Sequence, residues 1–89
     1  MAWKIEFVPA AGKELKKLGK MEAARVIATL ETRIAVLDDP RRLGSALTGE
    51  LGGLWRWRIG DYRVIARIED ERITILVLRV AQRRQVYRK

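Results

Sequence analysis

In the N-terminal part of the chain, the spacing of apolar residues changes once, from alternation to helical spacing. Apolar residues first alternate with polar ones, which predicts a strand from Trp3 to Val8. Pro9 ends that strand and suits the first position of a helix. Apolar residues then recur at helical spacing in two runs, which predict helices over residues 9–18 and 21–37 with a break at Gly19. The two helices form a hairpin whose apolar side must pack against another element.

The middle of the chain is rich in glycine and the part after it is strand-like. Residues 41–53 predict a loop, with one helical turn around residues 43–47. Residues 54–59 and 62–69 both alternate with a period of two, which predicts two strands. Gly60-Asp61 between them is a two-residue turn of the kind that closes a hairpin.

The last apolar run predicts an interior strand. Residues 72–80 are apolar at almost every position, as expected of a central strand that is covered on both faces. Residues 81–89 are too polar for a core. The resulting order is β-α-α-β-β-β, so we expect a single α+β domain over residues 1–89, with a helical hairpin on one face of a small, mainly antiparallel sheet.

Arginines define the opposite face of that sheet. Alternation puts Arg56 and Arg58 on the same side of their strand, away from the apolar Trp55 and Trp57. The tight turn then brings Arg63 close to them across the ladder. The pattern therefore predicts a basic concave surface opposite the helices, with the two tryptophans in the core.

Composition excludes several kinds of site. The 89 residues include no Cys and no His, which excludes a disulfide framework and a thiolate metal site, argues against zinc and removes the commonest general base. No apolar run approaches the roughly 20 residues that a membrane span needs. No secretory leader is visible before the first strand, so we expect a cytoplasmic protein with no cofactor.

Positive charge is concentrated near the C-terminus. The net charge is +8, from 19 basic and 11 acidic residues, and every charged residue from Arg72 onward is basic. Such an excess favours contact with a polyanion, because Lys and Arg release counterions from phosphates. The alternative is a solvated basic surface without a nucleic-acid partner, and charge alone leaves both open.

One set of residues has the chemistry for phosphate. Arginine is a planar cation that binds phosphate in a bidentate manner, and several around one phosphate stabilise a pentacoordinate transition state without a metal. A tyrosine stacks on a base or donates a hydrogen bond. Arg56 and Arg58 also fit the solvent side of an amphipathic strand, whereas no packing demand explains the residues beyond the last strand. The candidate set is Arg56, Arg58, Arg63, Arg83 and Tyr87, with Arg84, Arg88 and Lys89 as further RNA contacts.

The same segments carry a family resemblance. Leu54–Ile65 resembles the central segment of RelE-type toxins of bacterial and archaeal toxin–antitoxin pairs, and Val80–Tyr87 resembles their closing motif. The opening Phe7–Ala11 and the helix stop Leu37–Pro40 fit as well. The resemblance thus covers almost the whole chain. It implies the fold of the RelE/ParE superfamily, cleavage of messenger RNA in the ribosomal A site, and a cognate antitoxin that neutralises the toxin.

The resemblance also implies a role for each candidate. Arg56 and Arg58 match a basic pair that binds the RNA backbone, and Arg63 matches an arginine near the scissile phosphate. Arg83 matches the arginine that stabilises the transition state, and Tyr87 matches a C-terminal tyrosine that engages the nucleotide. The implied reaction is attack by the ribose 2′-hydroxyl on the adjacent phosphorus, which leaves a 2′,3′-cyclic phosphate.

Departures from the family pattern keep other functions open. Relatives commonly have Gly-His at Ala81-Gln82 and Glu at Gln85, so two titratable groups are missing here. Some relatives have Lys at the two positions that Arg56 and Arg58 occupy here. Arginine stays protonated and is therefore a poor general base. One alternative is a ParE-like inhibitor of DNA gyrase. Another is a module that binds RNA or antitoxin with weakened catalysis.

Overall fold

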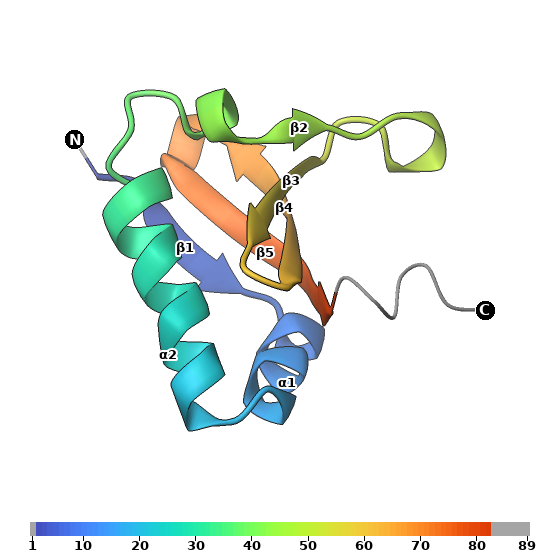
Figure 1. The fold of residues 1–89 in the computed structure, drawn as a ribbon. Coiled ribbons are helices and arrows are strands. Elements are labelled where there is room, and N and C mark those ends of the chain that lie inside the picture. Colours follow the sequence, from blue (N-terminus) through green and yellow to red (C-terminus); the bar gives the residue numbers. More distant parts are fainter. Residues whose placement is uncertain (1, 83–89) are drawn as a thin grey trace.

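A five-stranded sheet carries two helices (Figure 1). The computed structural model describes residues 2–82. The sheet order is β1-β5-β4-β3-β2; β1 runs parallel to β5, and the other neighbours are antiparallel. The predicted α+β class is confirmed. The elements are β1 (Lys4–Phe7), α1 (Pro9–Lys17), α2 (Lys20–Thr29), β2 (Ser45–Ala46), β3 (Trp55–Ile59), β4 (Tyr62–Glu69) and β5 (Thr74–Gln82).

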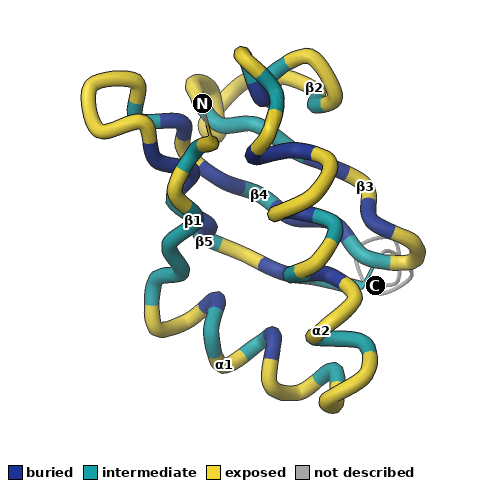
Figure 2. Tube along the Cα trace, turned by 90° about the vertical axis from the view of Figure 1, so that its left-hand side faces the viewer, coloured by how far each residue is buried: buried dark blue, intermediate teal, exposed yellow. Residues whose placement is uncertain are grey.

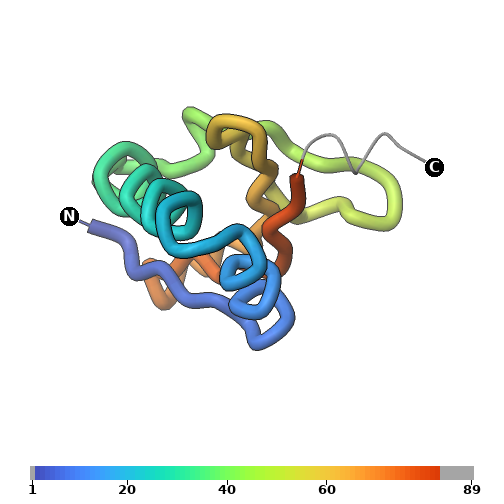
Figure 3. The backbone as a smooth tube through the Cα atoms, turned by 60° about the horizontal axis from the view of Figure 1, so that its bottom comes forward, coloured from blue at the N-terminus to red at the C-terminus, as the bar shows by residue number. Residues whose placement is uncertain are grey.

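The core lies between the helices and one face of the sheet. The helices lie side by side (Figures 1 and 3), and Leu15 of α1 and Val26 of α2 point into the core. The interior strands carry most of the buried residues, seen as dark segments in Figure 2. Full burial of one such side chain stabilises the fold by about 1.5–3 kcal/mol. The strand contribution to the core is Trp57, Ile59, Val64, Ala66, Ile68, Ile75, Val77 and Val80.

The second helix is shorter than its apolar pattern predicts. α2 ends at Thr29, and Leu30–Ile34 continues as a π-helical turn, in which the Ala35 amide donates to the Leu30 carbonyl at 2.7 Å. The wider turn buries Leu30, Ile34 and Ala35 together. Directly after this turn, the Ala35 carbonyl accepts a hydrogen bond from the Trp3 amide at 2.8 Å. The prediction of one regular helix to residue 37 was therefore wrong.

The segment predicted as a loop over residues 41–53 contains a strand. The helical turn expected around residues 43–47 is wrong, because β2 pairs with β3 there and the 3₁₀ turns lie at Pro40–Leu43 and Gly49–Leu51. Two residues of pairing are too short to give a periodic signal. β2 lies at the free edge of the sheet (Figure 1).

A tryptophan ties this segment to the sheet. The side chain of Trp57 is 1% exposed, and its Nε1 donates to the carbonyl of Pro40 at 3.0 Å. Gly44 passes so close that a Cβ on it would lie 3.0 Å from Trp57 Nε1. The segment is also held by Arg41, which pairs with Asp39 at 3.0 Å and Asp70 at 2.7 Å. Hydrogen bonds from Arg41 lower the pKa of Asp39 despite partial desolvation.

The last strand begins and ends two residues later than predicted. β5 runs from Thr74 to Gln82, so Ala81 and Gln82 belong to the sheet. Its interior position between β1 and β4 is confirmed. The prediction that β5 is buried on both faces is not confirmed, because Leu76 and Leu78 are only half-buried. Within residues 2–82, no helix is long and apolar enough to cross a bilayer.

Candidate nucleic-acid interface

Four arginines share the sheet face that points away from the core. Strand register links Arg56 of β3 to Ile65 of β4 and then to Arg79 of β5. The neighbouring row links Arg58 to Arg63 and then to Ala81. Side chains in one such row lie on the same face. We call Arg56, Arg58, Arg63 and Arg79 the arginine face.

Two of these arginines stand directly opposite each other. Arg58 and Arg63 are Cα partners in the β3–β4 hairpin, as the sequence predicts. Like charges in this position destabilise a sheet unless an anion lies between or beside them. Arg58 is exposed, whereas Arg63 is only 7% exposed and has its own polar interactions in the fold. Such a pair is suited to binding an anion.

Arg63 lies across from Arg58 as predicted, but its side chain is buried within the predicted basic surface. Arg63 lies on the interior strand β4, with Arg58 on one side and Ala81 on the other, and its side chain is buried. Buried cations are held rigidly and interact strongly with charge, because the surrounding dielectric is low. Arg63 is therefore a fixed charge beneath the surface that Arg58 presents.

Arg56 and Arg58 differ from the ion-paired arginines that the structure describes and resemble Arg33, Arg42 and Arg67 in this respect. Within residues 2–82, neither makes an ion pair with a carboxylate. Guanidinium groups without a carboxylate keep all their donors for a ligand. The arginines that are paired are Arg25 with Glu22, Arg41 with Asp39 and Asp70, Arg72 with Glu6 and Glu69, and Arg79 with Glu14.

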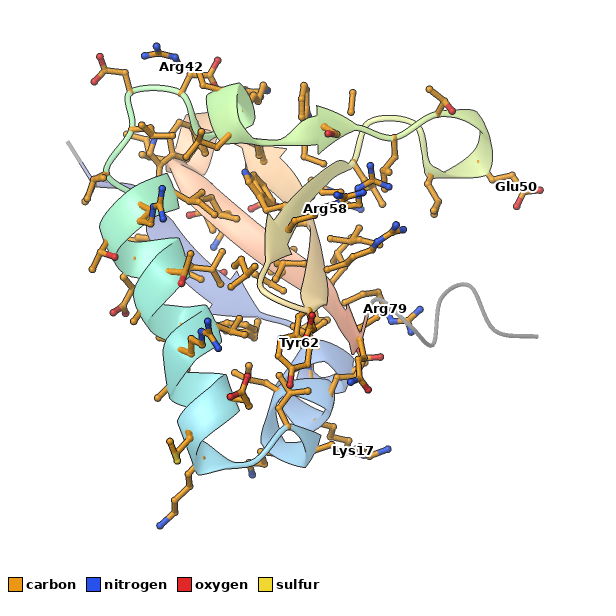
Figure 4. All side chains as sticks on the ribbon, in the orientation of Figure 1. Lys17, Arg42, Glu50, Arg58, Tyr62 and Arg79 are labelled. Carbon is orange, nitrogen blue, oxygen red and sulfur yellow. The ribbon has the colours of Figure 1, made fainter. Side chains whose placement is uncertain are left out.

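Arg56 and Arg58 line a groove beside β2. The groove measures about 310 Å³, and its other lining residues are Leu43 and Ser45. Arg58 is labelled in Figure 4. A second hollow of about 210 Å³ shares Leu43 and Arg58 with it and reaches Arg33. The lining thus combines guanidinium groups, a hydroxyl and one exposed leucine, without a carboxylate. This composition fits the phosphate and sugar of a nucleotide, or an acidic peptide.

The chemistry of the described groups is electrostatic. Arginine donates hydrogen bonds but is a poor general base, so Arg56, Arg58 and Arg63 can stabilise negative charge but are not suited to abstract a proton. Within the described part of the chain, no cluster of His, Cys, Asp or Glu is suited to hold a metal ion. The remaining predicted site residues, Arg83, Arg84, Tyr87, Arg88 and Lys89, lie outside the described residues.

The aromatic residues of the hairpin are structural. Trp57 is in the core as predicted, and Trp55 is half-buried with the Arg41 guanidinium 5.8 Å from its ring centroid. Tyr62 is half-buried, and desolvation and the nearby Glu22 carboxylate raise its pKa. A tyrosine in this position is not suited to give up its proton.

Three residues of the interface escape prediction from the sequence. Leu43 and Ser45 enter it only because β2 pairs with β3. Arg79 enters it because of a register shift in the β4–β5 ladder between Ile65 and Ala66. The one signal that could have indicated Arg79 is that it is a charged residue within an otherwise apolar strand.

Comparisons with known proteins agree with this architecture. The chain matches the ParE toxin of type II toxin–antitoxin systems, parDE, over residues 5–87. It is 36% identical over 90 residues to Toxin RelG of Mycobacterium tuberculosis, with 100% of both chains covered. It is 31% identical over 84 residues to Toxin RelE of the same organism, which covers 94% of this chain and 84% of the relative.

A solved structure is similar to this chain over most of its length. It belongs to the toxin–antitoxin complex RelBE2 from Mycobacterium tuberculosis. The TM-score is 0.84 at 32% sequence identity, and the match covers 93% of each chain.

Proposed function

Because the chain belongs to the ParE toxin family and is a RelE-like toxin of a toxin–antitoxin pair, we propose that it stops translation by cutting messenger RNA. The proposed substrate is mRNA in the ribosomal A site. The ribose 2′-hydroxyl attacks the adjacent phosphorus, a new O2′–P bond forms and the P–O5′ bond breaks. The products are a 2′,3′-cyclic phosphate and a 5′-hydroxyl, and no metal ion takes part.

The observation that carries the proposal is the arrangement of Arg56, Arg58 and Arg63. Two guanidinium groups without carboxylate partners lie beside a third that is buried, and Arg58 faces Arg63 directly across the ladder. A phosphodiester gains negative charge as it becomes pentacoordinate. Fixed cations that are already in place stabilise that charge without reorganisation.

The proposed division of labour combines this geometry with the family resemblance. Arg56 and Arg58 bind the RNA backbone in the groove beside β2, and Arg63 supplies a fixed charge near the scissile phosphate. The family resemblance gives Arg83 the stabilisation of the transition state and Tyr87 the contact with the nucleotide. Since no histidine is present, Tyr87 or water moves the protons. Arg84, Arg88 and Lys89 add contacts to the RNA backbone.

The proposed partner is an antitoxin with an acidic, amphipathic segment. RelBE2 is itself a toxin–antitoxin complex. Leu43 is 55% exposed and lies in the same groove as Arg56 and Arg58, so an apolar side chain flanked by carboxylates would cover all three. Binding there would block the RNA site. A small soluble toxin of this kind would act in the cytoplasm.

Primer extension on an abundant mRNA after induced expression tests the proposed function. The wild-type protein should produce discrete stops at codon boundaries, and Arg83→Ala should abolish them because the transition state loses its cation. Tyr87→Phe keeps the ring and should weaken the stops only in part.

Co-expression of the product of the neighbouring gene provides the control for the partner. Suppression of both the stops and the growth arrest is expected. If Arg83→Ala remains as toxic as the wild type, the protein acts by binding and not by cleavage. A neighbouring product that neither binds nor protects would contradict the proposed partner.

A gyrase inhibitor is the second candidate, and the matched family, whose description is that of ParE toxin, favours it. The two functions separate cleanly with purified protein. Inhibition of DNA supercoiling by gyrase, with no cutting of mRNA on programmed ribosomes, would support the gyrase target. The reverse result would support the nuclease.

A further inference from the structure

The outer edge of β5 changes its partner halfway along the strand. β1 pairs with β5 only from Thr74 to Val77, and the last bond of that edge runs from the Val8 amide to the Val77 carbonyl at 3.0 Å. Pro9 then turns the chain into α1. From Leu78 onward β5 has no neighbouring strand on this side within residues 2–82.

A glutamate of α1 takes the place of the missing strand. Glu14 Oε1 accepts a hydrogen bond from the amide of Val80 at 2.8 Å. Its other oxygen, Oε2, accepts one from Nε of Arg79 at 3.0 Å. One carboxylate thus holds both the backbone and the neighbouring side chain, and hydrogen bonds to a charged acceptor are the strong ones.

The two contacts lie immediately after a bulge. Ala66 pairs with Val77, but Ile65 pairs with Arg79, so Leu78 is the extra residue. In a regular strand, Arg79 would fall on the buried side together with Ile75 and Val77. The bulge instead places Val80 in the core and Arg79 on the arginine face. Glu14 therefore binds Arg79 and Val80, the two residues whose faces of the sheet are exchanged by the bulge.

The position of the bulge also affects the C-terminal end of the strand. Ala81 pairs with Arg63, and Gln82 is the last residue of β5. Arg83 comes directly after it in the sequence. The phase of β5 at Arg79 and Val80 is therefore shared by Ala81 and Gln82, the last described residues before the positions that the proposed mechanism assigns to catalysis.

We propose that Glu14 is a positioning residue whose carboxylate fixes the bulged segment 78–80 of β5 and, through it, the end of the strand at Gln82, which directly precedes the catalytic tail (residues 83–89). The inference rests on the proposed function, because the tail matters only if Arg83 and Tyr87 act on RNA. Glu14 does not touch the substrate. It acts through Val80 and Arg79, next to a groove of about 360 Å³ that Lys17 and Gln82 also line. Lys17 and Arg79 are labelled in Figure 4.

The test compares Glu14→Ala, Glu14→Gln and Glu31→Ala with the wild-type protein. Glu31 is an exposed glutamate on the π-helical turn, so its removal changes the net charge in the same way. For each protein, kcat and KM for mRNA cleavage on programmed ribosomes are measured, together with hydrogen exchange of the Val80 amide and the thermal midpoint. Rates are compared at a temperature at which all four proteins are folded.

Removal of the carboxylate should slow the chemical step and leave binding intact. We expect Glu14→Ala to expose the Val80 amide to exchange and to lower kcat by on the order of 10²-fold, the effect of a misplacement of about 1 Å. KM should change little, because Arg56 and Arg58 are untouched. Glu14→Gln keeps a carbonyl acceptor for the Val80 amide and should recover most of the lost kcat. Glu31→Ala should match the wild type.

Three results would overturn the inference. The first is a wild-type kcat in Glu14→Ala despite rapid exchange at Val80, and the second is a Val80 amide that stays protected in that variant. The third is a loss of activity that appears in KM alone. If the wild-type protein cuts no RNA at all, the proposed function fails, and exchange at Val80 still decides whether Glu14 holds β5.

Discussion

Replacement of Arg58 by alanine is expected to lower the rate of mRNA cleavage by about 10²–10³-fold, the usual loss when one preorganised donor to a developing charge is removed. Arg58 is exposed, makes no ion pair within residues 2–82 and lies opposite the buried Arg63. Its loss therefore removes a cation from the site without removing a packed side chain. The thermal midpoint should stay the same or rise slightly, because two like charges no longer face each other.

Arg67→Ala is the matched control for Arg58→Ala. Arg67 lies on β4 and, like Arg58, is exposed. Its register partner is Leu76, so it lies on the same face of the sheet but is not part of the arginine face. Both variants lose one positive charge. A loss of cleavage of equal size in the two variants would show that only the overall charge matters, and would contradict a specific site at Arg58.

Replacement of Trp57 by alanine is expected to destabilise the fold by about 3–5 kcal/mol, the range for buried aromatic side chains. Small domains have only about 5–15 kcal/mol of stability in total. The indole is 1% exposed and its Nε1 donates to the Pro40 carbonyl, so the change removes core volume and leaves a buried acceptor without its donor. Urea unfolding followed by circular dichroism measures the difference.

Trp57→Phe separates the two contributions. Phenylalanine keeps most of the apolar contact and loses the hydrogen bond, so its cost should be well below that of alanine. Toxicity in cells should follow stability in this series, because the variants also loosen the segment that carries Leu43 and Ser45. A Trp57→Ala protein that unfolds at the wild-type urea concentration would show that Trp57 does not anchor this segment.

The fold and most of the described site follow from period and turn chemistry. Alternation places Arg56 and Arg58 on one face, and Gly60-Asp61 places Arg63 across from them, as the register shows. These are local rules, and each side chain obeys them independently of the rest. The same rules place Trp57 in the core.

The features that sequence could not give depend on contacts between distant segments. β2 exists because Ser45 and Ala46 meet β3, and neither residue has a strong preference for a strand. The π-helical turn exists because it buries Leu30, Ile34 and Ala35 at once. Burial of Arg63 is not marked in the sequence either, because Arg67 has the same place in the alternation of β4 and is exposed.

The bulge in β5 has the largest consequence for function. A one-residue insertion reverses the face of every later residue in the strand, and nothing in the apolar run of residues 72–80 marks Leu78 as the extra residue. The contact of Glu14 with Val80 joins residues that are 66 positions apart. Only the folded chain brings the two together.

Cleavage of an mRNA that carries one 2′-deoxynucleotide at the mapped cut site tests the central claim most directly. On programmed ribosomes, the wild-type toxin should cut the all-ribose mRNA and leave a 2′,3′-cyclic phosphate. It should fail to cut at the deoxy position, where the attacking hydroxyl is missing. Cutting at the deoxy position, or a product that ends in a 3′-hydroxyl, would contradict a mechanism in which the arginines stabilise attack by the 2′-hydroxyl.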